Sequence, residues 1–172
     1  MTGTLVRDAR PGDHDGLREL LAAAYDQYAG AVAVRALFDR YLADVLDVDG
    51  SPEASTLVAE TDGRLAGTAR FYPAGAVPYL PAGWAWVRAV GVRPDLRGAG
   101  VARALMGDCV RRAADGGAAV LSLHTMAFMA DAVRLYERLG YRRAPELDID
   151  VARHYGVGGE MVALAYRLTV ES

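Results

Sequence analysis

Hydrophobic residues recur every three or four positions in four segments of the chain, which is the spacing of one face of an α-helix. In the first segment, Leu17, Leu20, Leu21 and Tyr25 follow Asp13, whose side chain we expect to cap the helix. The segments that this spacing predicts as helices are 11–25, 31–45, 98–114 and 129–139.

Shorter runs of apolar, β-branched and aromatic residues predict strands. These runs span 4–8, 55–60, 65–72, 84–92, 118–124, 141–147 and 161–169. Asp62-Gly63 stands between the second and third runs, as in a tight β-hairpin. Because no repeat or linker interrupts this order, we expect residues 1–172 to form one α/β domain, a mixed sheet with helices on its faces.

The composition indicates a globular chain and narrows its partners. Of the 172 residues, 52% are hydrophobic, and the net charge of −3 argues against nonspecific nucleic-acid binding, which requires a basic surface. No apolar run approaches the roughly 20 residues of a membrane-spanning helix, and the N-terminus lacks the apolar segment of a secretory signal. The single cysteine, Cys109, excludes an internal disulfide. We therefore expect a cytoplasmic protein with no membrane or nucleic-acid partner.

A glycine-rich turn follows the strand predicted over 84–92 and leads directly into a helix. Its sequence is Arg97-Gly98-Ala99-Gly100-Val101-Ala102. Such a turn aims several backbone N–H groups at one point, at the positive end of the helix dipole, and so predicts a pyrophosphate site. The dinucleotide-binding pattern would follow the first strand, and the phosphate-loop pattern needs a lysine, of which the sequence has none. Both of these nucleotide-binding alternatives are disfavoured.

Two motifs resemble those of the GCN-five-related N-acetyltransferases (GNAT). Val90-x-Val92, Pro94 and the turn 97–102 fit the pattern R/Q-x-x-G-x-G/A of the family's first motif. Residues 132–141, AVRLYERLGY, fit its second, A-x-x-L-Y-x-x-x-G-F/Y, in the expected order. The resemblance covers essentially the whole chain. It implies a mostly antiparallel sheet of about seven strands, flanked by about four helices, in which the fourth and fifth strands splay apart.

The same resemblance implies the coenzyme site. Acetyl-CoA would be the co-substrate, with its pantetheine arm bonded to the fourth strand and its diphosphate on the amides of the turn. The expected coenzyme-binding residues are Val90, Gly91, Val92, Arg97, Gly98, Ala99, Gly100, Val101 and Ala102. Tyr136 matches the family's general acid, and a backbone N–H near Val90 is the expected oxyanion donor. No metal is expected.

The general base is missing from its usual place. Many relatives carry a glutamate on the fourth strand, whereas 84–92 contains no carboxylate; unbroken alternation would put Trp84, Trp86, Arg88, Val90 and Val92 on one face. His124 is the candidate base by its chemistry, with Asp26 and His154 as alternatives. A mildly basic α-amine, with a pKa of about 7.7–8.0, needs no base, unlike a lysine at about 10.4. A second departure is Met129, where the family often has an asparagine that bonds the pantetheine arm.

The resemblance also implies that the acceptor pocket lies between the first two helices and the loops after the third and before the last strand. These segments hold aromatic and acidic residues: Tyr25, Tyr28, Phe38, Tyr41, Tyr72, Tyr79, Trp84, Trp86, Asp148, Asp150 and Tyr155. Tyr25, Trp84 and Trp86 are our candidate substrate residues, and the blend favours a small-molecule amine. A peptide N-terminal amine, a lysine, and a coenzyme-A-binding sensor without turnover remain alternatives. The run 163–168 could pair as an edge strand in a homodimer.

Overall fold

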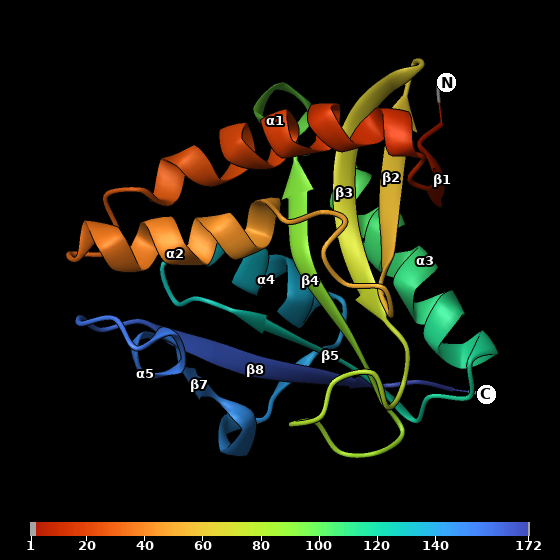
Figure 1. Ribbon diagram of the computed structural model, residues 1–172. Coiled ribbons are helices and arrows are strands. Elements are labelled where there is room, and N and C mark those ends of the chain that lie inside the picture. The colour runs from red at the N-terminus through yellow and green to blue at the C-terminus, as the bar shows by residue number, and fades with distance from the viewer. Residues whose placement is uncertain (1–2, 172) are drawn as a thin grey trace.

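In the computed structural model, which describes residues 3–171, eight strands form an open sheet (Figure 1). Their order is β1-β2-β3-β4-β5-β8-β6, and β7 also pairs with β8. The pairing of β4 with β5 is parallel, and the other pairings are antiparallel. The strands are β1 (Leu5–Asp8), β2 (Ser55–Thr61), β3 (Arg64–Tyr72), β4 (Trp84–Val92), β5 (Val120–Thr125), β6 (Arg142–Arg143), β7 (Ile149–Asp150) and β8 (Val162–Thr169).

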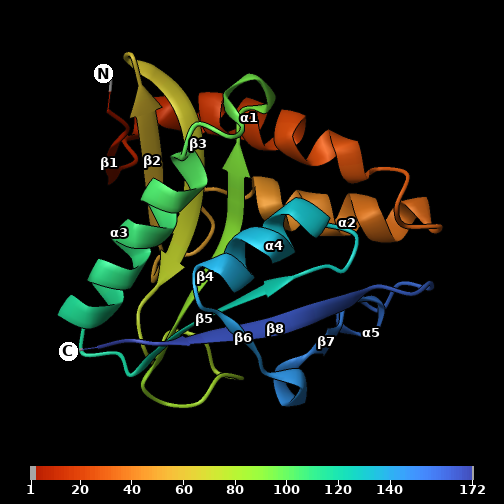
Figure 2. The same ribbon diagram turned by 180° about the vertical axis from the view of Figure 1, so that it is seen from behind.

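Helices cover both faces of the sheet. On the face nearer the viewer in Figure 1 lie α1 (His14–Tyr25) and α2 (Arg35–Leu46). The other face, in front in Figure 2, carries α3 (Val101–Asp115) and α4 (Ala130–Arg138). A short fifth helix, α5 (Val151–Tyr155), precedes β8. The mixed sheet flanked by helices is the architecture predicted from the sequence.

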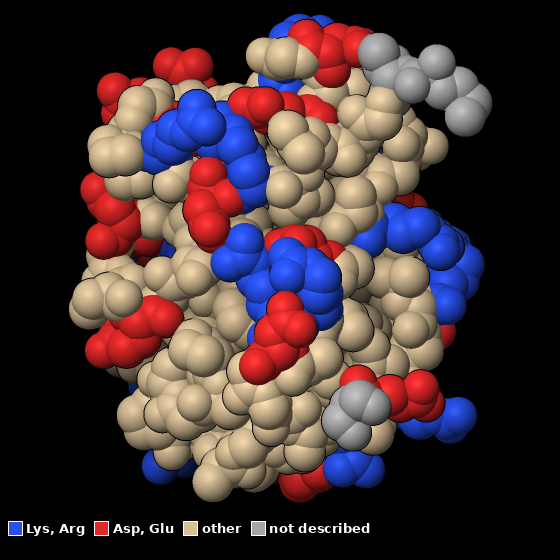
Figure 3. All heavy atoms as spheres, turned by 90° about the vertical axis from the view of Figure 1, so that its right-hand side faces the viewer, with Lys and Arg blue, Asp and Glu red and all other residues tan. Residues whose placement is uncertain are grey.

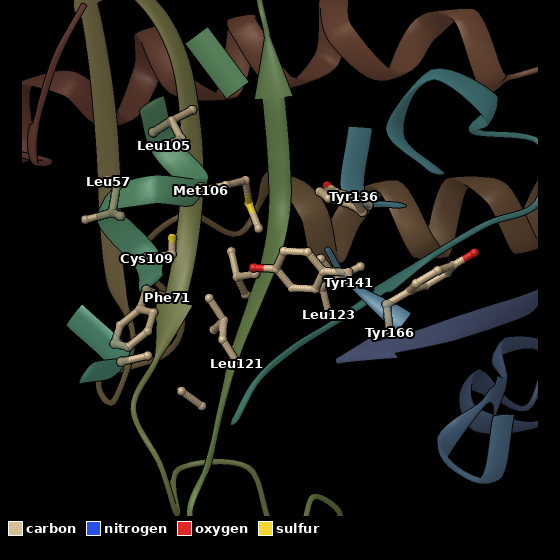
Figure 4. Packing of buried hydrophobic residues seen from close by; sticks show 14 of the residues in the cluster. Leu57, Phe71, Leu105, Met106, Cys109, Leu121, Leu123, Tyr136, Tyr141 and Tyr166 are labelled. Atoms are coloured by element: carbon tan, nitrogen blue, oxygen red, sulfur yellow. The ribbon is translucent and has the colours of Figure 1, made fainter. Parts of the chain in front are cut away.

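Two hydrophobic clusters fill the space between the sheet and its helices. Figure 4 shows the cluster beneath α3, where Leu105 and Met106 pack against Leu57 of β2 and Leu121 of β5. Cys109 is fully buried in this cluster, and burial raises the pKa of its thiol to about 12. It is therefore a core residue. The second cluster lies under α1 and α2, with Leu17, Leu21, Leu37 and Phe38 at its centre.

The structure corrects three expectations near the ends of elements. Asp13 does not cap α1, because its carboxylate accepts hydrogen bonds from the Arg7 guanidinium and the Arg10 N–H. Only Arg142–Arg143 of the segment 141–147 is a strand, and β7 and α5 form where a loop was expected. The run 163–168 is not an edge, since β8 lies between β5 on one side and β6 and β7 on the other. The proposed basis for a homodimer is therefore removed.

A β-bulge in the middle of β4 decides which side chains face which helices. Thr68 pairs with Gly91 and Arg70 with Arg88, so Ala69 of β3 alone lies opposite two residues of β4. Ala89 takes a left-handed conformation, φ +51°, at this point. A residue with a Cβ is disfavoured there by about 1–2 kcal/mol.

The bulge breaks the side-chain alternation expected for 84–92. Ala89 packs in the cluster under α1 and α2, whereas Val90 and Val92 pack against the cluster beneath α3. A Cβ on Gly91 would lie 2.9 Å from Leu21 of α1, on the opposite side from Val92. Val90 and Val92 therefore do not share a face with Arg88 because the extra residue reverses the alternation.

Charged side chains are mixed on the surface that carries both chain ends. Figure 3 shows basic and acidic residues lying next to one another on this face. On α3, for example, Arg111 and Arg112 both pair with Asp108, and Arg112 also reaches Asp8. Within the described residues, no helix combines the length and apolar character that a membrane crossing requires.

Candidate active site

β4 and β5 separate beyond Val87, and a cavity lies where they part. The two strands pair only over 84–87 and 120–123, while β4 continues to Val92 and β5 to Thr125. Figure 1 shows the far end of β4 diverging from β5. A cavity of about 620 Å³ occupies this region, and α1, α2, the turn before α3, α4 and α5 all contribute to its walls. The expected splay of these strands is confirmed.

The turn before α3 presents bare backbone to the cavity. Gly98 and Gly100 have φ angles of +80° and +83°, a region that glycine adopts far more readily than other residues. A Cβ at either position would meet nothing within 4 Å, so the space in front of the turn is open. The N–H groups of the first turn of α3 have no partners within the helix and lie beside this space. An anion is stabilised at such a place.

Arginines border the same end of the cavity, which we call the coenzyme end: Arg97, Arg103, Arg134 and Arg138. Arg97 donates from Nη2 to the Ala24 carbonyl at 3.1 Å, which ties the turn to the end of α1. Arg134 pairs with Asp131. Guanidinium groups match the geometry of phosphate oxygens, so the residues at this end fit a diphosphate-bearing coenzyme.

The predicted coenzyme residues gather at this end with one exception. Val90, Gly91, Val92, Arg97, Gly98, Gly100, Val101 and Ala102 line the cavity, whereas Ala99 does not. Met129 also lines it, with Thr125 donating a hydrogen bond from Oγ1 to its sulfur at 3.8 Å. Since Met129 has no amide, the polar contacts available to a ligand here come from the backbone and from the hydroxyl.

The exposed backbone of β4 is held in place by α1. Arg93 N donates to Ala66 O on the β3 side, so by strand alternation the polar groups of Val92 point away from β3, toward the gap. The Val90 carbonyl accepts a hydrogen bond from the Tyr25 hydroxyl at 3.2 Å. Tyr25 is buried, and burial raises the pKa of its hydroxyl well above the usual value, so it remains a donor. Tyr25 therefore ties the bulged segment of β4 to α1.

Tyr136 of α4 lines the cavity. Its ring packs edge-on against Tyr141, with centroids 5.9 Å apart, and Figure 4 shows the two rings side by side. Burial raises the pKa of Tyr136 far above its ordinary value, so the hydroxyl is protonated at neutral pH. Tyr141 does not line the cavity, and its buried hydroxyl has no hydrogen-bond partner among the described residues. The two rings are thus in contact, but only Tyr136 lines the cavity.

Both ring nitrogens of His124 are engaged. The Trp86 indole N–H donates to Nδ1 at 3.0 Å, and Nε2 lies 2.9 Å from the Leu147 carbonyl. Because an indole N–H only donates and a carbonyl only accepts, the ring must be neutral, with its proton on Nε2. Burial lowers the pKa of His124 further. The lone pair that a base needs is occupied, so the geometry contradicts His124 as the general base.

The other end of the cavity, which we call the acceptor end, is aromatic. Of the residues expected there, Tyr25, Tyr28, Tyr41, Tyr79, Trp86 and Tyr155 line the cavity, with Tyr28 near Arg97 and the others toward this end. Phe38, Tyr72, Trp84, Asp148 and Asp150 do not. Trp84 instead lies under Arg167, Asp148 pairs with Arg143, and Asp150 caps α5. The structure therefore removes Trp84 from the candidate substrate residues and retains Tyr25 and Trp86.

Two charged residues at the acceptor end were missed by the sequence analysis. Arg88 of β4 and Asp44 of α2 both line the cavity. No motif marks either of them, because the bulge and the approach of α2 place them there. The only sequence signal was a charged residue within a strand that is otherwise apolar. His154, an alternative base, also lines the cavity, whereas Asp26 does not.

Comparison with known proteins agrees with this geometry. The family model described as the acetyltransferase (GNAT) family matches residues 15–141, which is most of the chain and includes both motifs. The chain belongs to the GNAT family. No curated protein sequence matches it.

Solved acetyltransferase structures share the fold over nearly the full length of this GNAT chain. The PaiA N-acetyltransferase from Thermoplasma acidophilum, in complex with coenzyme A, has a TM-score of 0.72 at 10% identity, covering 97% of this chain and 99% of its own. The putative acetyltransferase yncA from Salmonella typhimurium, with acetyl-CoA, has a TM-score of 0.62 at 17% identity and coverages of 99% and 96%. The ribosomal-protein-S18-alanine N-acetyltransferase from Escherichia coli has 0.63 at 19%, with the same coverages. At these identities the likeness shows the fold alone.

Proposed function

We propose that this GNAT protein transfers the acetyl group of acetyl-CoA to a primary amine of a small molecule, by direct attack of the amine on the thioester. The observation that carries the proposal is the continuity of the cavity. One space of about 620 Å³ reaches from the glycine turn, past Tyr136, to the aromatic acceptor end. Two reactants that enter from its two ends would meet beside Tyr136.

Residues of the turn and of β4 would hold the coenzyme. The amides of Gly98, Gly100 and the first turn of α3 would bind the diphosphate, and the glycines let the backbone approach it closely. The polar groups of Val92 point into the gap between β4 and β5, where an extended arm can bond as an added strand does. Acetyl-CoA is the co-substrate, and it supplies the activated acyl group.

Each remaining requirement of the reaction has a candidate group. A backbone N–H beside Val90, at the bulge, would stabilise the negative charge that develops on the thioester oxygen. Tyr136 would donate its proton to the departing sulfur, for which its protonated, buried hydroxyl is suited. Tyr25 would act through the Val90 carbonyl as a positioning residue, since it holds the bulged backbone in place.

The amine would lose its proton to water rather than to a side chain. β4 has no carboxylate, the lone pair of His124 is occupied, and Asp44 already accepts hydrogen bonds from Arg40 and Tyr155. An amine of modest basicity is partly neutral near pH 7, whereas a lysine side chain is almost fully charged. This favours an α-amine or a similar amine over a protein lysine as the acceptor.

A peptide N-terminal amine is the second candidate acceptor. The fold is also that of an enzyme whose name states a ribosomal-protein alanine acceptor, so the fold does not decide between the two. The small-molecule acceptor is favoured by the aromatic side chains around the acceptor end, which suit a compact apolar body. A coenzyme-binding sensor without turnover is the alternative of a different class.

Titration of the protein with acetyl-CoA, followed by assay of free-thiol release with small amines and with N-terminal peptides, tests the proposal. We expect saturable coenzyme binding and thiol release that matches the acetylated amine formed, with small amines turned over fastest. Thiol release with N-terminal peptides alone would show that the acceptor is a peptide amine and not a small-molecule amine. Binding without release on any amine would favour the sensor, and absence of binding would refute the assignment of the turn.

A further inference from the structure

Arg88 brings a positive charge into the acceptor end of the cavity. Its guanidinium lines the cavity, yet it forms no salt bridge with any carboxylate of residues 3–171. Its near neighbours are tyrosines, among them Tyr41 and Tyr155, and the Trp86 ring, whose centroid lies 5.5 Å from the guanidinium carbon. A guanidinium is always charged at neutral pH and has only donors to offer.

Asp44, a carboxylate that acts on the charge of Arg88, already has hydrogen-bond partners. Asp44 accepts from Arg40 Nη1 at 3.2 Å through one oxygen and from the Tyr155 hydroxyl through the other. Arg40 also stacks on the Tyr155 ring, 4.8 Å from its centroid. Arg40 and Arg88 therefore share the charge of Asp44, and two guanidinium groups against one carboxylate leave a net positive charge here.

Comparison with Arg70 shows how differently the two arginines of this strand pair are held. The two arginines are cross-strand partners on β3 and β4, and like charges directly opposite each other are destabilising. Arg70 is buried and donates to the Asp44 and Val45 carbonyls at the C-terminal end of α2, at 3.3 and 2.8 Å. There its charge is stabilised by the helix dipole. Within residues 3–171, Arg88 donates to no backbone carbonyl; it lines the cavity beside the Tyr155 hydroxyl.

Building on the proposed function, we infer that the acceptor amine carries a carboxylate, as an amino acid does, and that Arg88 binds this carboxylate while the aromatic side chains hold the apolar part. A carboxylate satisfies the fork of Arg88 with two parallel hydrogen bonds. The amine is then directed along β4 toward the bulge, because Arg88 lies two residues before Val90 on the same strand. A polycationic amine is disfavoured, since it would place like charges together.

The test compares an amino acid that has an aromatic or aliphatic side chain with its carboxamide, in the wild type, Arg88→Met, Arg88→Lys and Arg167→Met. Methionine keeps an apolar stem without charge. Arg167 is an exposed arginine over Trp84, outside the cavity, so it serves as the control. For each protein, kcat/KM of the amino acid is divided by kcat/KM of its carboxamide. The two amines differ in basicity, but this difference affects the ratio equally in every protein and cancels when the proteins are compared.

We expect Arg88→Met to lower the acid-to-amide ratio about 30-fold, mainly through the KM of the acid, because a charged hydrogen-bonded pair is lost. Arg88→Lys should restore part of the ratio, and Arg167→Met should leave it unchanged. Thiol release with a ratio that Arg88→Met does not alter would overturn the inference and leave the proposed function standing.

Direct binding distinguishes this failure from failure of the proposed function. Titration of the amino acid into the protein saturated with coenzyme A should show binding that Arg88→Met weakens, even if no amine is acetylated. Equal binding by both proteins, or none by the wild type, would also overturn the inference. Coenzyme binding and the thermal midpoint of each variant, measured beside these titrations, show that the variants are folded.

Discussion

Backbone groups form most of the coenzyme end of the cavity, whereas side chains form the acceptor end. At the coenzyme end the groups are mostly backbone: the glycine turn, the N–H groups that begin α3, and the free edge of β4. At the acceptor end they are side chains, such as Tyr41, Trp86, Arg88 and Tyr155, from segments far apart in the chain. Amino-acid substitutions leave backbone groups unchanged, so a backbone site keeps the same ligand. A site made of side chains can bind a different ligand when its residues are substituted.

The difference also sets how each end is stabilised. The conformation of the turn is set locally by the positive φ angles of its glycines, and a tertiary hydrogen bond from Arg97 to the Ala24 carbonyl ties the turn to α1. The acceptor end depends on tertiary contacts, including the Trp86 hydrogen bond to His124 and the link from Tyr155 to Asp44. Substitutions at the two ends should therefore have separable effects on the coenzyme and on the amine.

Replacing Tyr136 by phenylalanine tests the point at which the two ends meet, and it should have the largest effect. Loss of the proton donor should lower kcat about 100-fold, while the Kd for acetyl-CoA stays the same, because general acid catalysis contributes roughly 10²–10⁴-fold. Steady-state kinetics and titration calorimetry give the two quantities.

Tyr141→Phe is the matched control for this change. Its ring touches Tyr136, but its buried hydroxyl has no hydrogen-bond partner within residues 3–171, and the residue does not line the cavity. Removing the hydroxyl should leave kcat unchanged and should not lower the thermal midpoint, since no hydrogen bond is lost. A similar fall in kcat for both variants would mean that Tyr136 acts through packing, and it would contradict the general-acid role.

The pH dependence of the reaction tests whether the acceptor end holds a base. Below the pKa of the amine, kcat/KM should rise about tenfold per pH unit, because only the neutral amine attacks. Since burial lowers the pKa of His124 and its lone pair is occupied, His124 should add no limb of its own.

Exchanging the acceptor for one with a less basic amine should move this rising limb to lower pH by the difference in amine pKa. A limb that stays at the same pH with every acceptor would instead reveal a titrating group of the protein, and His154 would then be the first residue to substitute.

Gly100→Ala tests the coenzyme end and should have the smallest effect of the three, about tenfold on the Kd for acetyl-CoA. The added Cβ projects into the open space before the turn and disfavours the φ of +83°. Gly63→Ala is its control, because Gly63 also has a positive φ, +73°, and open surroundings, but it lies in the hairpin between β2 and β3.

Both glycine variants should lose a similar free energy of unfolding, about 1 kcal/mol, from backbone strain. Only Gly100→Ala should bind the coenzyme more weakly. Equal coenzyme affinity in the two variants would contradict the role given to the turn.

The fold and the coenzyme end could largely be predicted from the sequence because their determinants are local. Asp62-Gly63 predicted a hairpin, and both of these turn residues have positive φ angles. The glycines of the turn 97–102 likewise predicted its conformation from the local sequence. The strand predicted over 141–147 was too long, and β7 and α5 were missed because elements of two and five residues carry no clear periodic signal. The pairing of β6 and β7 with β8 also changes an expected edge into an interior strand.

The acceptor end could not be predicted because long-range contacts decide it. The bulge at Ala89 depends on the register of β3 against β4, and it reverses the faces of Val90 and Val92. The hydrogen bond from Trp86 that excludes His124 as a base joins two strands 38 residues apart in sequence. Trp84 was misplaced for the same reason: its neighbour is Arg167 of β8.

The most direct test of the account is a calorimetric titration of acetyl-CoA into three proteins, the wild type, Gly100→Ala and Arg88→Met. We expect the wild type and Arg88→Met to bind with the same Kd and Gly100→Ala to bind about tenfold more weakly, because only the turn holds the coenzyme. Equal binding by all three proteins, or a loss caused by Arg88→Met rather than by Gly100→Ala, would contradict the division of the cavity into a coenzyme end and an acceptor end.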